Sequence, residues 1–320
     1  MPDRGSNASP VPSWALSSLD LPEGSVVCLD GGLATELESR GFRFETPLWS
    51  AQLLIDNAGA VHDSHLAYLE AGARIITSAS YQATLQGFAG QGIEPERARE
   101  MLLESVRIAK RARDDAKADT GRAALVAASI GPYGAYLADG SEYRGNYGLD
   151  ADRLEHFHRE RIEILDQSGA DLLACETVPD YLEACALARI LEEISTPSWV
   201  SFCCRDDAVL HDGTPVEAAA AIFESIEKVF AIGVNCTAPE HVPSLIGRIR
   251  SAVPDKTVVV YPNSGEHYRD GTWTGERAAS RWERNCREWI ECGARIVGGC
   301  CRIGPHEIRQ LVRIAEGCYS

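Results

Sequence analysis

Two adjacent cysteines, Cys300 and Cys301, are the residues of this chain best suited to chemistry. They follow Gly298 and Gly299 at the end of a short apolar run, in the segment RIVGGCCRIG. Such a pair can form a disulfide, fill a core or bind a metal ion. Side chains alternate between the two faces of a regular strand, so both thiols can face one metal only where the strand breaks. The two glycines permit such a break.

The composition indicates a globular protein with reduced thiols. The chain has 320 residues, of which 45% are hydrophobic, enough for the core of one large α/β domain. A net charge of -16 argues against nucleic acid or an anionic membrane as a partner. The 11 cysteines are an odd number in a long chain, unlike a disulfide scaffold. We expect core fillers or ordinary thiols at Cys28, Cys175, Cys185, Cys203, Cys204, Cys286, Cys292 and Cys318.

Residues 1–24 are polar and lack a basic stretch followed by an apolar one, so they do not predict a signal peptide. We expect a flexible N-terminal tail over residues 1–24, followed by a single domain over residues 25–320. No run approaches the roughly 18 apolar residues of a membrane helix. The expected protein is cytoplasmic, has no membrane partner, and is a monomer or a homodimer.

Short apolar runs alternate with amphipathic runs along the domain. The apolar residues of the short runs are nearly continuous, as in strands buried on both faces. The amphipathic runs carry helix signals, such as Asp150 at one start and Gly72 at one end. Expected strands cover residues 26–32, 74–80, 124–132, 171–178, 198–204, 229–236, 257–263 and 294–301. Expected helices cover residues 61–72, 95–116, 150–170, 180–194, 216–226, 239–251, 277–291 and 305–316.

Strands and helices that alternate in this number predict an α/β fold, a single (β/α)8 TIM barrel. The competing fold is a doubly wound open sheet, which usually has a Gly-rich phosphate turn after its first strand. The segment LDGGLATE does not match G-x-G-x-x-G. Two long connections, residues 131–149 and 263–276, follow the third and seventh expected strands. Long irregular βα loops lie on the catalytic face of a barrel.

The carboxyl ends of the strands form the active-site face of such a barrel. Cys236 ends the sixth expected strand, and Cys300 and Cys301 end the eighth. Three thiolates suit zinc, which is tetrahedral and prefers sulfur and nitrogen, and they leave a fourth position open. The alternative is that the cysteines fill the core. The other polar residues at strand ends are Asp30, Ser78, Glu176 and Asn263.

A zinc ion held by three thiolates is electron-rich and a good host for a fourth, substrate thiolate. Coordination deprotonates that thiol near neutral pH and leaves it nucleophilic, which indicates alkyl transfer to sulfur. Asp30 and Glu176 could bind the ammonium group of a thiol amino acid, and the N–H groups of Gly31 and Gly32 could receive its carboxylate. Asp30 could equally be a turn residue, and Glu176 a helix cap.

The chain resembles the zinc-dependent homocysteine S-methyltransferases, and among them the single-domain, S-methylmethionine-type branch. The matching segments include LDGGLATELESRG, EAGARIITSASYQAT, DLLACETVP, GVNC and GARIVGGCCRIGPHEI, which span nearly the whole chain beyond the tail. The resemblance implies a (β/α)8 barrel. It also implies Zn2+ ligands at Cys236, Cys300 and Cys301, homocysteine contacts at Asp30 and Glu176, and support of the metal site by Asn235.

The implied partners are small molecules, namely homocysteine and a sulfonium methyl donor such as S-methylmethionine or S-adenosylmethionine. A sulfonium is a cation, which aromatic faces and carboxylates could bind. Because the departing thioether is neutral, no general acid is needed, so the reaction does not require a catalytic histidine. His62 and His65 lie in an expected helix, and we expect both on its surface. The residues considered as donor contacts are Trp49, Tyr133, Tyr136, Glu142, Tyr143 and Glu266.

Four other functions remain open at this point. A betaine donor, or a selenium acceptor such as selenocysteine or selenohomocysteine, would suit the same fold. A glycosidase barrel would pair Glu176 with Glu266 but would leave the cysteines unexplained. A non-catalytic zinc or redox protein would need a fourth protein ligand or thiols that respond to oxidation.

Overall fold

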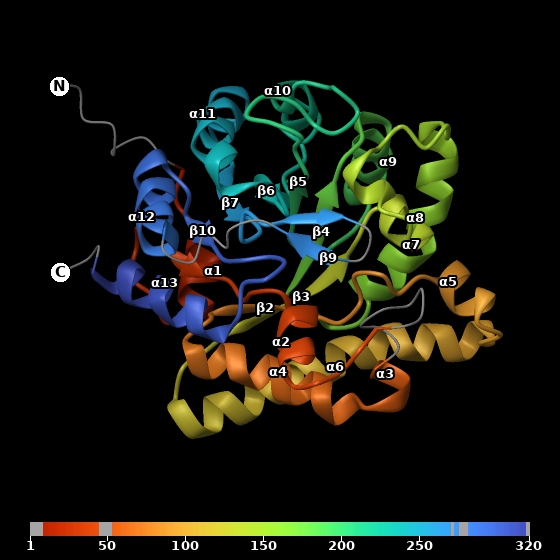
Figure 1. Cartoon of the computed structure of the whole chain (residues 1–320), viewed down its shortest axis with the longest axis horizontal. Helices are drawn as coiled ribbons and strands as arrows, with labels where there is room; N and C mark the ends of the chain where they lie inside the picture. Colours follow the sequence, from red (N-terminus) through yellow and green to blue (C-terminus); the bar gives the residue numbers. More distant parts are fainter. Residues whose placement is uncertain (1–8, 45–52, 270–271, 275–280, 318–320) are drawn as a thin grey trace.

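Parallel strands form a ring at the centre of the molecule, with helices around it (Figure 1). The computed structural model describes residues 9–44, 53–269, 272–274 and 281–317. The eight-stranded sheet has the order β1-β10-β7-β6-β5-β4-β3-β2, and a parallel bridge between Leu29 and Ile75 closes the ring. The strands are β1 (Val27–Cys28), β2 (Ile75–Thr77), β3 (Leu125–Ile130), β4 (Leu172–Val178), β5 (Ser198–Phe202), β6 (Val229–Asn235), β7 (Thr257–Tyr261) and β10 (Ile296–Val297).

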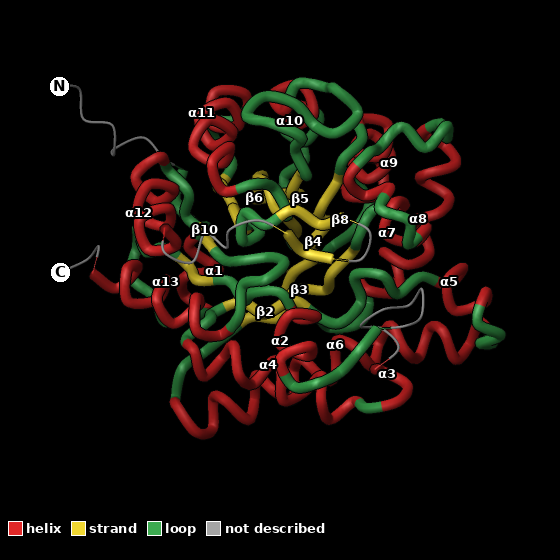
Figure 2. Tube along the Cα trace, viewed as in Figure 1, coloured by secondary structure: helices red, strands yellow, loops and turns green. Residues whose placement is uncertain are grey.

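The ring confirms the expected TIM barrel, and each strand lies within its expected range. Figure 2 shows the helices outside the strands. The expected helices appear as α4 (Ala58–Ala71), α6 (Pro95–Thr120), α8 (Ala151–Asp166), α9 (Tyr181–Leu191), α10 (Val216–Ala221), α11 (Val242–Ala252), α12 (Trp282–Cys292) and α13 (Pro305–Gly317). Residues 277–280, expected at the start of α12, lie outside the described residues.

Several short elements were not expected from the sequence. A hairpin of β8 (His267–Arg269) and β9 (Thr272–Thr274) occupies the long connection after β7. The additional helices are α1 (Ser13–Ser18), α2 (Leu33–Ser39), α3 (Leu53–Asp56), α5 (Leu85–Gly90), α7 (Tyr133–Leu137), η2 (Ser141–Tyr143) and η3 (Pro239–His241). Within the described ranges, no helix is long and apolar enough to cross a membrane.

The expectation of a flexible tail is wrong for residues 9–24. Helix α1 packs against the amino ends of the strands, where the buried Leu16 and Leu19 join the apolar cluster inside the barrel. Thr257 Oγ1 donates to the carbonyl of Pro10 at 2.7 Å. The ring of Trp14 lies edge-on to that of Phe230, with centroids 5.5 Å apart. An open barrel end offers apolar surface, and burying it stabilises α1. The boundary of the domain at residue 25 stays a prediction.

Replacing Leu19 by alanine is expected to lower the free energy of unfolding by about 2–4 kcal/mol, because it leaves a cavity under the barrel. Leu19 is 0% exposed, whereas Leu182 on α9 is 45% exposed. Leu182→Ala is therefore the matched control, with an expected change within about 0.5 kcal/mol. Denaturant unfolding of both variants checks this, and equal midpoints would show that α1 does not contribute to the folded core.

The expectation that His65 lies on a helix surface is also wrong. Helix α4 packs against α2, α6 and α13, so more than one of its faces is covered. His65 is 0% exposed. Burial, and to a smaller extent the charge of the neighbouring His62, lowers the pKa of His65 to about 3. His62 is half-buried and contacts Asp115 at 2.9 Å. His65 is thus a neutral residue of the core.

Candidate active site

A cavity opens at the carboxyl ends of the barrel strands, where the topology brings together residues from distant segments. It contains seven of the eight residues predicted for the site, while Asn235 lies buried behind its wall. The cavity is lined by Asp30, Gly31, Gly32, Leu33, Ala34, Thr35, Thr77, Ser78, Ala79, Tyr81, Gln82, Ser129, Glu142, Tyr143, Glu176, Thr177, Cys236, Tyr261, Gly299, Cys300 and Cys301.

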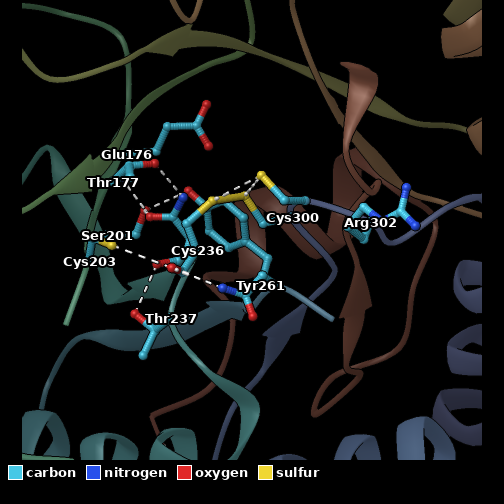
Figure 3. The surroundings of a disulfide bond; sticks show 12 residues. Glu176, Thr177, Ser201, Cys203, Cys236, Thr237, Tyr261, Cys300 and Arg302 are labelled. Atoms are coloured by element: carbon cyan, nitrogen blue, oxygen red, sulfur yellow. Dashed lines mark hydrogen bonds between the residues drawn. A yellow bond between two sulfur atoms is a disulfide. The ribbon is translucent and has the colours of Figure 1, made fainter. Parts of the chain in front are cut away.

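The sulfur atoms of Cys236, Cys300 and Cys301 meet at one side of this cavity, all within 4.8 Å of one another. Cys236 and Cys300 are joined by a disulfide, and Figure 3 shows this bond between β6 and the end of β10. Cys301 Sγ lies 3.8 Å from Cys236 Sγ and 4.0 Å from Cys300 Sγ. The expectation of reduced thiols is therefore wrong for this pair. Reduced, the same three sulfurs would form an open triangle of soft metal ligands.

Gly298 and Gly299 bring the two cysteines against the end of β1. A Cβ atom on Gly298 would lie 2.6 Å from Leu29 Cβ, and one on Gly299 would lie 2.2 Å from Ile303 Cγ2. The N–H of Gly299 donates to the carbonyl of Asp30 at 3.0 Å. Neither glycine has a positive φ. Close approach of Leu29 and Asp30 to Gly298, and of the Ile303 side chain to Gly299, therefore requires glycine here rather than a left-handed turn.

Cys236 has a left-handed backbone conformation, with φ 45°, which is uncommon for a residue with a side chain. Its carbonyl accepts a hydrogen bond of 3.4 Å from the Cys203 thiol (Figure 3) and another of 3.4 Å from Asn263 Nδ2. These contacts hold the backbone turn that carries the Cys236 sulfur. Cys203 is buried, as expected for a core filler, but it also positions a residue of the sulfur cluster.

Asn235 connects the ends of β4 and β6. Its Oδ1 accepts from the Thr177 N–H at 2.6 Å and from Ser201 Oγ at 2.8 Å, and its Nδ2 donates to Thr177 Oγ1 at 2.7 Å. Thr177 is left-handed as well, with φ 62°. Glu176 directly precedes Thr177, and Cys236 directly follows Asn235. One buried amide therefore fixes the backbone beside both residues.

Asp30 and Glu176 are two buried carboxyls that face the same cavity. Burial raises the pKa of Asp30 well above its ordinary value, and the nearby Glu176 raises it further. Hydrogen bonds from Thr77 lower this pKa and offset part of the rise. Burial raises the pKa of Glu176 to about 7, against hydrogen bonds from Ser129 and Tyr261. Two carboxylates in a desolvated site stabilise a cation, which in turn favours their ionised forms. Their arrangement suits an ammonium group.

Gly32 does not offer its N–H to a substrate carboxylate, contrary to the expectation for the DGG turn. That N–H donates to the carbonyl of Ile303 at 3.0 Å. A Cβ on Gly32 would lie 2.7 Å from the carbonyl oxygen of Cys300, and one on Gly31 would lie 2.4 Å from that of Ile303. Both glycines therefore allow close packing against residues 300–303, which we call the cysteine loop.

The structure adds residues that the sequence did not single out. Thr77 donates its N–H to Asp30 Oδ2 at 2.7 Å and its hydroxyl at 3.1 Å. Ser129 donates to Glu176 Oε1, and Trp199 Nε1 donates to the Tyr261 hydroxyl at 2.9 Å. The only sequence signal for these groups is a polar side chain inside an apolar strand, which does not identify a partner.

Some of the residues considered as donor contacts line the cavity, and the other described ones pack or bond elsewhere. Glu142 and Tyr143, in η2, line the cavity. Tyr133 and Tyr136 pack against Phe157, with ring centroids 4.9 and 5.3 Å away. Glu266 does not line the cavity and accepts from Ser264 Oγ at 2.8 Å and Arg302 Nε at 3.2 Å. Trp49 and the expected filler Cys318 lie outside the described residues.

Comparison with known proteins places this geometry in a family. The family model for homocysteine S-methyltransferases matches residues 27–315. The homocysteine S-methyltransferase YbgG of Bacillus subtilis is 43% identical, over 91% of this chain and 95% of that protein. The Escherichia coli homocysteine S-methyltransferase is 42% identical, over 91% and 96%. A selenocysteine Se-methyltransferase of Brassica oleracea is 42% identical, over 93% and 91%.

Solved structures agree with these sequence matches. The metallated form of the homocysteine methyltransferase MmuM from Escherichia coli superposes with a TM-score of 0.81 at 40% identity, over 90% of this chain and 95% of that one. Its oxidized form superposes with a TM-score of 0.84 at 40% identity, over 93% and 99%. The chain therefore belongs to the homocysteine S-methyltransferase family.

Proposed function

We propose that this protein transfers a methyl group from a small sulfonium compound to the thiol of homocysteine, producing methionine. The observation that carries the proposal is the meeting of three cysteine sulfurs and two buried carboxyls in one cavity. The sulfurs suit a metal that binds a thiol, and the carboxyls suit the ammonium group of the same amino acid. Family membership supports the proposal, and S-methylmethionine is the first donor to test.

The three cysteines fit a zinc ion better than a hard metal such as magnesium, because all the donors are sulfur. Without a metal, burial raises the pKa of the Cys301 thiol to about 11, although a hydrogen bond from Tyr143 opposes the rise. The Cys301 thiol is therefore neutral at pH 7 and needs a metal to ionise. When bound, zinc would lower the pKa of a fourth sulfur and keep it as a nucleophilic thiolate. The disulfide uses two of the ligands, so reduction must precede metal binding.

The protein residues orient the acceptor for transfer. Asp30 and Glu176 would bind its ammonium group, while its thiol proton is released to solvent. The thiolate sulfur then forms a bond to the donor methyl carbon as the bond from that carbon to the sulfonium sulfur breaks. The bonding pair stays on the departing sulfur, which becomes a neutral thioether. Positioning at near-attack distance supplies much of the rate.

A selenium acceptor is a second candidate, since one relative is named a selenocysteine Se-methyltransferase. A selenolate is a soft ligand like a thiolate and would suit the same three sulfurs. Selenocysteine is shorter than homocysteine by one methylene. Comparing kcat/KM for homocysteine and selenocysteine with a common donor therefore distinguishes the two functions.

The decisive experiment measures zinc per chain and methionine formation in fully reduced protein, with homocysteine and S-methylmethionine. We expect one zinc per chain and steady turnover. Protein oxidised to the Cys236–Cys300 disulfide is the matched control and is expected to bind no zinc. Turnover in metal-free protein would contradict the role of the sulfurs. Zinc binding without turnover of any sulfonium donor would contradict the reaction.

The raised pKa of Glu176 predicts an acid limb in the homocysteine dependence. Because this pKa is about 7, the carboxylate is protonated and loses its charge as the pH falls below 7. We expect kcat/KM for homocysteine to decrease there by up to about tenfold per pH unit. Glu176→Gln should lower kcat/KM at neutral pH and remove the limb. A pH profile of both proteins checks this, and an unchanged limb in the variant would assign it to another group.

A further inference from the structure

Two acceptor oxygens of the cavity have no hydrogen-bond partner among the described residues. They are Oε2 of Glu142 and Oε1 of Gln82, and both are shielded from solvent. Gln82 is only 6% exposed, and its Nε2 donates to the carbonyl of Ala135 at 3.0 Å. Because a carbonyl can only accept, this bond fixes the amide and leaves Oε1 unpaired. Buried acceptors without a donor are costly, and a positive charge placed beside them would offset that cost.

The backbone holding Glu142 is closely packed. A Cβ atom on Gly134 of α7 would lie 2.4 Å from the Glu142 nitrogen. The N–H of Tyr133, which begins α7, donates to Glu183 Oε1 at 2.5 Å, and His158 Nε2 contacts the same oxygen at 2.7 Å. His158 and Glu183 are fully buried. A rigid platform of this kind is typical of a preformed binding site.

The surroundings of Glu142 suit a cation. Tyr81 and Tyr143 line the same cavity, and aromatic rings attract cations. Tyr143 also forms a side-chain hydrogen bond with Cys301, so this region adjoins the sulfur cluster. Arg144, the next basic residue in the chain, is exposed and pairs with Asp139 at 3.1 Å. Glu142 is thus acidic, shielded and next to the place where the acceptor sulfur would lie.

The charges of the two substrates match the carboxyls of the cavity. Asp30 and Glu176 face the ammonium group of the acceptor in the proposed function, which leaves Glu142 for a second positive charge. We propose that Glu142 and Gln82, with the rings of Tyr81 and Tyr143, form the subsite that binds the sulfonium centre of the methyl donor. This inference rests on the proposed methyl transfer and identifies the donor as a small cation whose positive centre is shielded from water.

The test separates charge from shape. Two unreactive analogues of S-methylmethionine serve as inhibitors, one with a trimethylammonium group and one with an uncharged tert-butyl group in its place. Wild type is expected to bind the cationic analogue at least about tenfold more tightly. In Glu142→Gln this preference should fall to near unity, and the KM for the sulfonium donor should rise about tenfold or more. The KM for homocysteine and the zinc content should stay within about twofold.

Two further variants keep the result interpretable. Glu70→Gln removes an exposed carboxylate on α4 that does not line the cavity, and it should leave the cation preference unchanged. Gln82→Glu adds a carboxylate to the subsite and should increase the preference, which a merely structural role would not do. An unchanged preference and donor KM in Glu142→Gln would overturn the subsite, provided that wild type turns over. Absence of turnover in wild type would instead reject the proposed function.

Discussion

Replacing Cys301 by serine is expected to abolish zinc binding and to reduce methionine formation on the order of a thousandfold or more, because a hydroxyl is a poor substitute for a soft thiolate ligand. Cys301 is the informative choice among the three cysteines, since it lies outside the disulfide of Cys236 and Cys300. The oxidised form of the variant can therefore still form that bond. Metal content and turnover of reduced protein are the measurements.

Cys185 provides the matched control for Cys301→Ser. It is half-buried on α9 and does not line the cavity. Cys185→Ser should keep its zinc and its turnover within about twofold, as expected for a substitution away from the site. Full zinc content in Cys301→Ser would mean that the other two sulfurs suffice with a ligand from elsewhere. That outcome would remove Cys301 from the proposed metal site.

Replacing Asn235 by alanine is expected to cost about 2–4 kcal/mol of stability and to reduce kcat/KM at least about tenfold. The variant leaves the Thr177 N–H and the Ser201 hydroxyl without their buried acceptor. It also frees the left-handed turn at Thr177, which the amide holds through two hydrogen bonds. Denaturant unfolding and steady-state kinetics of the variant test both effects.

Asn263→Ala is a graded comparison for the Asn235 variant. Asn263 is half-buried; its Nδ2 reaches the Cys236 carbonyl at 3.4 Å, and its Oδ1 accepts from the Gly265 N–H at 2.9 Å. We expect its loss to cost less than about 1 kcal/mol. If both variants lost the same stability and activity, the bridge made by Asn235 would have no special role. A loss of stability without a loss of activity would separate the fold from the site.

The positions of the main site residues follow from topology that the sequence encodes. Continuous apolar runs predict buried parallel strands, and the carboxyl ends of such strands meet on one face. Asp30, Glu176, Cys236 and Cys300 stand at those ends, so their shared cavity was predictable before any distance was known. Glu142 was predictable only as one of several candidates, because residues 131–149 have no repeating pattern.

Other features depend on contacts between segments that no local pattern describes. The disulfide joins residues 64 positions apart and depends on where the Cys236 turn and the cysteine loop meet. The left-handed turn at Thr177 depends on the Asn235 amide of β6, and the one at Cys236 depends on the Cys203 thiol beyond β5. Burial of His65 depends on how many helices cover α4. In each case a tertiary contact overrides the local preference.

The alternative of a glycosidase is not supported by the arrangement of the carboxyls. Glu176 lines the cavity, but Glu266 does not and is held by Ser264 and Arg302. The pair required for glycoside hydrolysis is therefore not formed by these two residues. Membership of the homocysteine S-methyltransferase family also argues against this function.

Helix α1 has a consequence for the order in which a growing chain can fold. Its Trp14 packs on Phe230, far along the sequence, and Pro10 before the helix accepts from Thr257. Strand β1 likewise pairs with the distant β10. Helix α1 and β1 can therefore dock only after segments much further along the chain have been made. Contacts over such long sequence separations are slow to form. Closure of the barrel should thus be a late step of folding.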